Sequence, residues 1–170
     1  MDVRIIKIDM KENTITLHSC MSAAETAASV RSGVSSARQQ VQDAKIRISA
    51  SERQIGAWQH LDWDLATDQA RAIDQAGRMD ASEDAAGGVL VGVPVGIKDI
   101  IDTVNMPTGW GFSPYDNRQP TKNAACVDAM IAAGAIPIGK TVTTEFAYFR
   151  PGKTANPHHL EHTPGGSSSG

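Results

Sequence analysis

The spacing of apolar residues predicts helices in the first half of the chain. Between positions 34 and 55, apolar side chains recur every three or four residues, which is typical of a helix with one buried face. They are Val34, Ala37, Val41, Ala44, Ile48 and Ile55. Ser35 or Ser36 stands where a helix prefers an N-cap. We therefore expect one long helix here, with its apolar stripe against the core.

Two more helices are expected on either side of this one. Residues 22–33 read as a short helix that closes on Gly33, because glycine readily adopts the left-handed conformation that ends helices. Residues 64–74 form the other, capped by Asp62 or Asp64. Its buried face is expected to carry Ala66, Ala70 and Ile73.

The pattern changes after the polar, glycine-containing link at 77–88. Residues 89–104, VLVGVPVGIKDIIDTV, are too continuously apolar for a half-exposed strand and predict a buried strand near the middle of a sheet. A helix is expected over 122–134 and another buried strand over 135–140. Strand, connection with helix, then strand is the order of a parallel crossover, so the predicted fold class is α/β.

The first twenty residues have a separate character. The segments 3–8 and 14–17 flank a polar KEN and predict an extra N-terminal hairpin. Met21 is itself a plausible start, so residues 1–20 are alternatively an upstream start-site artefact.

Composition and charge narrow the class of protein. With 170 residues, 41% hydrophobic and 21% charged, the chain fits one globular domain. A net charge of −3 gives no basic surface for phosphates, so we expect no nucleic acid partner. No apolar run is long enough for a bilayer and no signal peptide pattern is present, which predicts a cytoplasmic protein without a membrane partner. Cys20 and Cys126 lack metal spacing and read as free thiols, with Cys126 as a small buried hydrophobe.

Residues 134–141, GAIPIGKT, match the phosphate-loop pattern G-x-x-x-x-G-K-T. A working phosphate loop follows a strand and runs into a helix, whereas here AIPI is itself the expected strand and a helix precedes it. Nucleotide binding is therefore the less favoured interpretation, and Lys140 is assigned no function.

Residues 156–162, NPHHLEH, gather three histidines and a glutamate. His158 and His162 are four apart, but Pro157 and Pro164 leave room for one helical turn only. Zinc needs three or four converging ligands. A polar surface loop is the better reading, and we expect no metal and no other cofactor.

Lys98 is the one lysine within the apolar run 89–104. Burying an ammonium is costly, so this lysine either reaches the surface at a strand end or loses its charge and serves as a base. The chain ends on TPGGSSSG (163–170), which by composition alone is typical of a flexible tail. The interpretation of Lys98 therefore depends on whether the 163–170 segment is a flexible tail or part of a site.

Taken together, three segments resemble the amidase signature family. They are GVPVGIKDIIDT (92–103), AAGAIPIGKTVTTEFA (132–147) and TPGGSSSG (163–170), and the helical lead-in LDWDLATDQARAID fits as well. The resemblance covers about residues 22–170. It implies the N-terminal portion of the amidase signature fold, with helices packed on a central mixed sheet, and a domain over 21–170.

The family hydrolyses carboxylic amides, or transfers the released ammonia, through a Ser–Ser–Lys triad. Carried over, Lys98 matches the catalytic lysine and Ser167 the middle serine, which the family holds behind a cis peptide bond. Gly165, Gly166 and Ser168 match the positions that place substrate and backbone. The resemblance also implies a small-molecule amide substrate, and it allows a homodimer for the parent protein. The form GKTVTTEFAYFRPG looks closer to small-amide, malonamidase-like hydrolases than to the transfer-RNA amidotransferase subunit.

Two neighbouring features are left open by the sequence. Trp110, Phe112 and Tyr115 either touch a substrate or fix the 105–120 loop, and the second is favoured. Glu145 either holds the GGSSSG segment by hydrogen bonds or is a solvated charge at a strand end.

The family's nucleophile lies in a second glycine–serine motif downstream of GGSSSG, and the sequence in hand stops at Gly170. We therefore expect an incomplete and inactive part of a longer amidase that acts on C–N bonds other than peptide bonds. The alternatives are a non-catalytic partner or descendant of the fold and, less favoured, nucleotide binding through 134–141.

Overall fold

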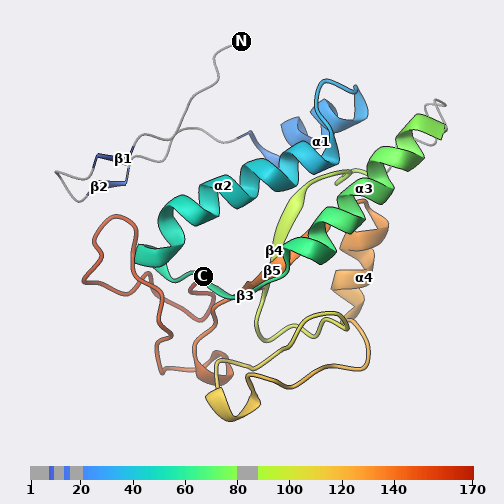
Figure 1. The fold of residues 1–170 in the computed structure, drawn as a ribbon. Helices are drawn as coiled ribbons and strands as arrows, with labels where there is room; N and C mark the ends of the chain where they lie inside the picture. Colours follow the sequence, from blue (N-terminus) through green and yellow to red (C-terminus); the bar gives the residue numbers. More distant parts are fainter. Residues whose placement is uncertain (1–7, 10–13, 16–20, 80–87) are drawn as a thin grey trace.

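The computed structural model describes residues 8–9, 14–15, 21–79 and 88–170 (Figure 1). At its N-terminal end, β1 (Ile8–Asp9) pairs with β2 (Thr14–Ile15) in antiparallel fashion. This short pair lies within the hairpin expected from the sequence. Cys20 and the rest of residues 1–20 lie outside the described residues.

Short-range capping explains where the three N-terminal helices begin. The Ser22 hydroxyl accepts from Glu25 N and the Glu25 carboxylate accepts from Ser22 N, a capping box that starts α1 (Ala23–Arg31). Ser36 caps α2 (Ala37–Ile55) by accepting from Gln39 N at 3.1 Å. Asp62 accepts from Leu65 N at 2.9 Å and starts α3 (Trp63–Met79). Of the caps left open by the sequence, Ser36 and Asp62 are therefore the ones used.

In the described part of the chain, the main sheet has three strands in the order β3-β5-β4. β4 (Pro94–Lys98) runs parallel to β5 (Ile136–Thr141), as the α/β prediction requires. β3 (Trp58–Leu61), which the sequence did not indicate, pairs with β5 antiparallel and makes the sheet mixed. The central strand is thus β5 and not the 89–104 segment.

The 89–104 segment also contains less strand than its apolar run suggested. Residues 89–92 form turns before β4, and Gly92 has a φ of +71° with Val30 against it, so the chain bends there. After Lys98 the chain turns again, because Ile101 N donates to Lys98 O at 2.9 Å. The strand ends at Lys98, so this side chain lies at the carboxyl end of β4 and not in the middle of a buried strand.

The main core lies between α2, α3 and β5 (Figure 1). Small side chains make this close packing possible. The buried members are Ala37, Val41, Ala44, Ala66, Ala70, Ile136 and Ile138. Val34 was expected in this stripe, but it precedes the cap of α2 and is 72% exposed.

The helix before β5 is α4 (Ala125–Ala132), which is followed by Gly134 with a φ of +90°. Its Val127 is buried, whereas Cys126 points to solvent, so the expectation of a buried cysteine is wrong. The helix periodicity explains this, since the neighbouring position takes the inward face.

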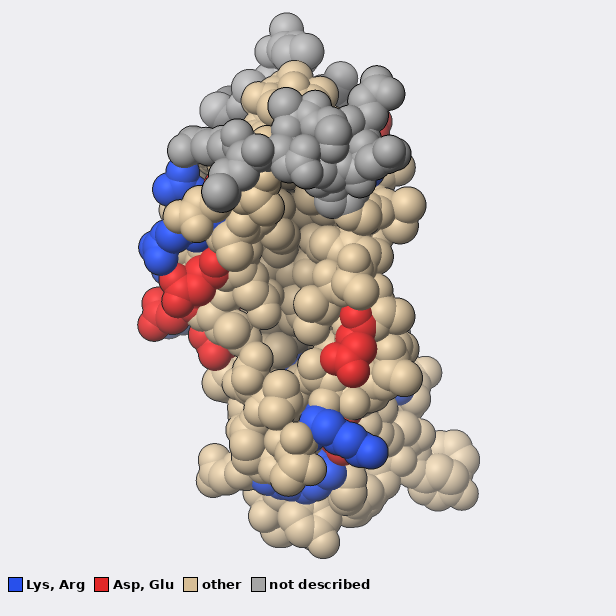
Figure 2. All heavy atoms as spheres, turned by 90° about the vertical axis from the view of Figure 1, so that its right-hand side faces the viewer, with Lys and Arg blue, Asp and Glu red and all other residues tan. Residues whose placement is uncertain are grey.

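Two observations describe the helices and one face of the surface. Within those ranges, no helix combines the length and apolar character needed to cross a bilayer. On the face in Figure 2, charged side chains stand in small separate groups among uncharged atoms and form no continuous basic band over the described part.

Candidate functional site

Lys98 is positioned by the register of β4 on β5. Its Cα lies opposite Thr141, and the next residue, Asp99, donates its N–H to Thr141 O at 2.9 Å. The side chain is half-buried at the carboxyl end of the strand. This is the edge of a parallel pair at which α/β proteins commonly place functional groups.

Ser167 reaches this strand end because the C-terminal segment folds back along the chain that follows β5. Ser167 O accepts hydrogen bonds from Thr144 N at 3.0 Å and from Thr143 Oγ1 at 3.2 Å. Ser169 N and Gly170 N both donate to Val142 O. The GGSSSG segment is therefore packed structure and not a loose tail, although its composition suggested one.

Two glycines in the segment are required by its geometry. Gly165 has a φ of +95°, a conformation that residues with a Cβ rarely adopt. At Gly166 a Cβ would stand 2.7 Å from Thr144 Cγ2. The peptide bond between Gly166 and Ser167 is cis. Ser168 is exposed, and its backbone pairs with Thr143 in an isolated bridge.

The two predicted side chains meet directly. Lys98 Nζ lies 2.7 Å from Ser167 Oγ, although sixty-nine positions separate them in the chain. Both are half-buried, so each is held by the fold yet open on one side. An amine and a hydroxyl at this distance can pass a proton between them.

The side chain of Glu145 pairs with Arg150 and does not hold the GGSSSG segment. Its carboxylate accepts from Arg150 Nη1 at 3.0 Å, in a pair whose arginine is exposed. Thr143 and Thr144 hold the segment instead, through Ser167 O. Glu145 is therefore an ion-paired carboxylate that is 25% exposed, lying in the turn Glu145–Ala147 after β5, and neither interpretation from the sequence describes it fully.

The aromatic residues of the 105–120 loop pack on one another. Trp110 and Phe112 each contact Tyr115, with ring centroids 5.6 and 5.5 Å away. Phe146 packs against Phe112. The Arg118 guanidinium lies 4.3 Å from the Trp110 ring. These contacts support the loop-fixing interpretation.

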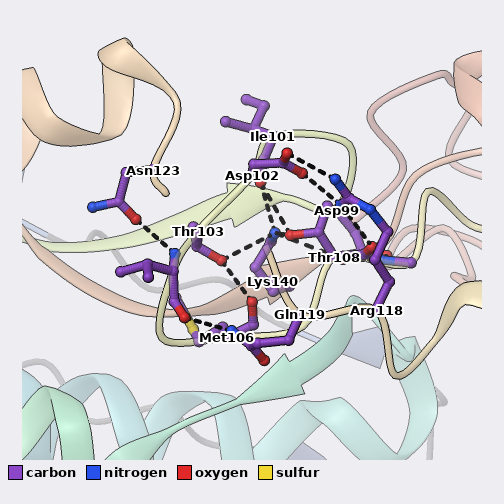
Figure 3. Close-up of polar contacts among 12 residues, drawn as sticks. Asp99, Ile101, Asp102, Thr103, Met106, Thr108, Arg118, Gln119, Asn123 and Lys140 are labelled. Carbon is purple, nitrogen blue, oxygen red and sulfur yellow. Dashed lines mark hydrogen bonds and ion pairs between the residues drawn. The ribbon is translucent and has the colours of Figure 1, made fainter. Parts of the chain in front are cut away.

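Figure 3 shows a second polar cluster, centred on Lys140. This side chain is 0% exposed. Its Nζ donates to Ile101 O at 2.7 Å and to Thr108 Oγ1 at 2.6 Å, and it lies 3.8 Å from Asp99 Oδ1. Burial lowers the pKa of Lys140 to about 8, and the charge of Asp99 opposes that shift.

Asp99 is the buried partner of Lys140. Its carboxylate accepts from Gly109 N at 3.2 and 3.3 Å. Burial raises the pKa of Asp99, while the Gly109 hydrogen bond and the charge of Lys140 work in the opposite direction. Beside the pair, Arg118 binds both oxygens of Asp102 and holds the pKa of that carboxyl below its usual value.

This cluster was not predicted from the sequence, because Lys140 was interpreted through its match to a phosphate-loop pattern. Its amine is occupied by the protein's own acceptors, and residues 136–141 of the pattern form β5, so the segment is not an open loop that could surround a phosphate. In the NPHHLEH segment, His159 Nδ1 and His162 Nδ1 lie 2.7 Å apart within a turn. Among the described residues, no three His, Cys, Asp or Glu side chains cluster as metal ligands would.

Comparison with known proteins identifies the family. The Amidase family profile matches residues 39–170. The chain belongs to the amidase signature family. A glutamyl-tRNA(Gln) amidotransferase subunit from Salinispora arenicola is 38% identical over 156 residues, covering 88% of this chain and 31% of that protein. Its counterpart in Salinispora tropica is 39% identical over 158 residues, with the same coverage.

Solved structures agree with the fold. The peptide amidase of Stenotrophomonas maltophilia superposes with a TM-score of 0.77 at 30% sequence identity, covering 86% of this chain and 32% of that one. The α/β architecture with helices on a mixed sheet is thus the amidase signature fold. The sequence spans about a third of the length of these relatives.

Proposed function

We propose that residues 21–170 supply the lysine and the middle serine of an amidase site that hydrolyses carboxylic amide C–N bonds. The observation that carries this is the 2.7 Å contact between Lys98 Nζ and Ser167 Oγ. Family membership supports amide chemistry at a coarse level. The contact supports the finer assignment, because a free tail has no reason to return to this strand end.

The proposed chemistry is a proton relay. The Lys98 amine, in its neutral form, takes the proton of the Ser167 hydroxyl, and Ser167 takes a proton from a nucleophilic serine. That serine attacks the amide carbonyl and forms an acyl-enzyme. The relay then runs in reverse to protonate the leaving amine, and water releases the acid.

Gly165, Gly166 and Ser168 have a positioning role in this proposal. Gly166 allows the backbone to pass Thr144, and Gly165 takes the positive φ of the turn, so that the Ser167 hydroxyl is presented to Lys98. Ser168 is exposed, and its backbone bridge to Thr143 helps to fix the segment beside Ser167. No cofactor enters the relay, and the substrate is a small amide.

The nucleophile and the oxyanion donors belong to sequence outside these 170 residues in this proposal. The coverage of about a third of each relative supports it. The 170-residue chain alone is therefore expected to release no ammonia from amides. Sequencing the gene past codon 170 tests this directly, since a continuing frame with a second glycine–serine motif is expected and a stop codon favours a non-catalytic descendant.

The class of amide is a further part of the proposal. We favour hydrolysis of a small amide over the ammonia transfer of an amidotransferase subunit, on the form of the 139–152 segment. The relatives named above are amidotransferase subunits and a peptide amidase, and they lend no weight to this finer preference. The proposed parent is cytoplasmic, and the family resemblance allows it to be a homodimer.

A hybrid amidase tests the relay. Residues 22–170 replace the matching third of the Stenotrophomonas maltophilia peptide amidase, and ammonia release from a peptide amide is measured. Ser167→Ala is expected to lower kcat by about 10²- to 10⁴-fold, because it removes the proton carrier. Ser32→Ala, an exposed serine at the end of α1, is the matched control. A folded hybrid without activity, or a Ser167→Ala variant near the parent rate, contradicts the proposal.

A further inference from the structure

We propose that the turn at Phe146 and Ala147 is a positioning element for the proposed site: its left-handed backbone conformation keeps Ser167 opposite Lys98. The inference rests on the roles proposed above for these two side chains. Phe146 and Ala147 are positioning residues in this scheme, and neither touches a reacting atom.

The backbone of this turn is unusual. Among the described residues, three that are not glycine have a positive φ, namely Trp110 at 59°, Phe146 at 49° and Ala147 at 57°. A Cβ crowds the backbone in this conformation, so such residues adopt it only where the surrounding contacts enforce it. Two of the three are bulky aromatic residues, in which the conformation is least expected. Strain of this kind is typical of functional sites.

The strained residues are in contact with one another. Phe146 N donates to Trp110 O at 2.8 Å, and the centroids of the two rings lie 6.2 Å apart. Gly111 has a φ of +65°, and a Cβ there would stand 2.8 Å from Thr143 O and 3.0 Å from Thr144 O. The backbone of the aromatic loop therefore touches the backbone before the turn, and a shift in one requires a shift in the other.

One side of this contact leads to Lys98. Trp110 N donates to Asp99 O at 2.9 Å, and Asp99 N donates to Thr141 O at 2.9 Å. The residue directly after Lys98 is therefore held by its backbone between β5 and the 105–120 loop.

The other side leads to Ser167. Ala147 N donates to Thr144 O at 2.8 Å, which closes the turn, and Thr144 N donates to Ser167 O at 3.0 Å. The Thr144 side chain is buried, and its Cγ2 lies against Gly166. The conformation of the turn therefore determines where Thr144 N stands, and with it the peptide of Ser167.

A series of backbone contacts thus joins the end of β4 to the GGSSSG segment, and residues with a costly conformation lie in its middle. Packing of the aromatic rings alone gives no reason for such a backbone. The strain is explained if the shape of the turn sets the 2.7 Å separation of Lys98 Nζ and Ser167 Oγ.

The first test measures the hydrogen bond from Thr144 N to Ser167 O in the 170-residue chain and needs no turnover. NMR gives the rate of amide hydrogen exchange at Thr144, with Ile136 N, which donates to Val93 O at 2.8 Å, as the internal reference. Ala147→Val is expected to raise the Thr144 rate at least tenfold and to leave Ile136 unchanged, because a β-branched residue disfavours a positive φ. Ala147→Gly is expected to stay within twofold of the unaltered chain, because glycine accepts this conformation.

The matched control is Ala129→Val, which adds the same two methyl groups to an exposed alanine with helical backbone in α4. It should leave the Thr144 rate unchanged. Ala147→Asn separates conformation from size, because asparagine is larger than alanine but tolerates the left-handed region. If Ala147→Val does not fold, Ala147→Asn decides: a Thr144 rate within twofold supports the inference, and any larger rise overturns it.

The same variants in the hybrid amidase connect the turn to the reaction. Ala147→Val is expected to lower kcat at least tenfold, and Ala147→Gly to keep it within twofold. Equal losses in both variants would mean that the methyl group of Ala147 matters and its conformation does not, which overturns the inference. A folded Ala147→Val variant with near-normal Thr144 exchange, or with near-normal kcat in an active hybrid, overturns it as well. An inactive hybrid whose exchange rates follow the expected order contradicts the amidase proposal alone.

Discussion

At the scale of single residues, the buried ammonium of Lys140 makes the stability of the chain depend on pH. Its pKa in the fold is about 8, below the ordinary value of 10.5. Between these values the unfolded chain binds a proton that the folded chain does not, so unfolding becomes less favourable as the pH rises. Below pH 8 both states carry the proton, and the full cost of burying the charge is present.

We therefore expect the stability lost in Lys140→Met to be larger at pH 10 than at pH 7.5, by on the order of 1 to 3 kcal/mol. Urea unfolding of the parent, of Lys140→Met and of the exposed control Lys122→Met at both pH values measures this. Equal losses at the two pH values would mean that Lys140 is not titrating in this window.

The two lysines also show what the sequence can reveal about a residue. Lys98 stood out because it interrupts an apolar run, and the fold places it at a strand end against Ser167. Lys140 also lies in an apolar strand, but its match to the phosphate-loop pattern offered a different interpretation of that lysine. Its acceptors come from positions 101–108, about thirty to forty residues away, and no local pattern records such partners.

At the scale of elements, short-range capping was the most predictable feature. Ser36 accepts from Gln39 N at the start of α2, an arrangement set by four consecutive residues. The strands were harder to predict from the sequence. β3 carries little apolar periodicity and is a strand because β5 lies beside it, while the 89–104 run was shortened by turns at both ends of β4.

The cap of α2 can be tested separately from the site. Ser36→Ala is expected to lower the free energy of unfolding by about 1 kcal/mol, because Gln39 N loses its acceptor. The matched control is Ser49→Ala on the exposed face of the same helix, where alanine has the better helix propensity and stability should hold or rise slightly. Equal losses in thermal or urea unfolding would show that the cap contributes nothing.

The GGSSSG segment has a matched pair of glycines for its own test. Gly165 and Gly33 both have positive φ, and a Cβ added to either would meet no atom within 4 Å, so alanine at either strains the backbone alone, by about 1 to 2 kcal/mol. In the hybrid amidase, Gly165→Ala should also lower kcat, because the strain falls two residues from Ser167. Gly33→Ala should leave kcat unchanged, and a fall in kcat for both variants would argue against a specific role of the segment.

At the scale of the whole molecule, large apolar side chains stand on the surface beyond β5. Tyr148 is 71% and Phe149 is 82% exposed, and both border a cavity of about 410 Å³ with Phe146. Exposed apolar groups gathered in this way bind hydrophobic dyes. The isolated chain is expected to enhance the fluorescence of such a dye, and Tyr148→Ser with Phe149→Ser to reduce it at least twofold.

The matched control for that experiment is Val34→Ser, an exposed apolar residue just before the cap of α2. It should leave the dye signal unchanged. A parent chain that binds no dye and melts sharply as a monomer would show that this surface needs no covering sequence. The family and fold class, in contrast, followed from the sequence, because GIKD and GGSSSG are specific motifs in the right order.

The most direct measurement of the central claim is the kcat of the hybrid amidase with Lys98→Arg. Arginine keeps the positive charge and much of the length, but its guanidinium does not give up its proton at working pH, so it cannot serve as the base for Ser167. Ammonia release is expected to fall to the level of Lys98→Ala, while the exposed control Lys122→Arg keeps the parent rate. A Lys98→Arg hybrid that hydrolyses its amide at a near-parent rate would contradict the account.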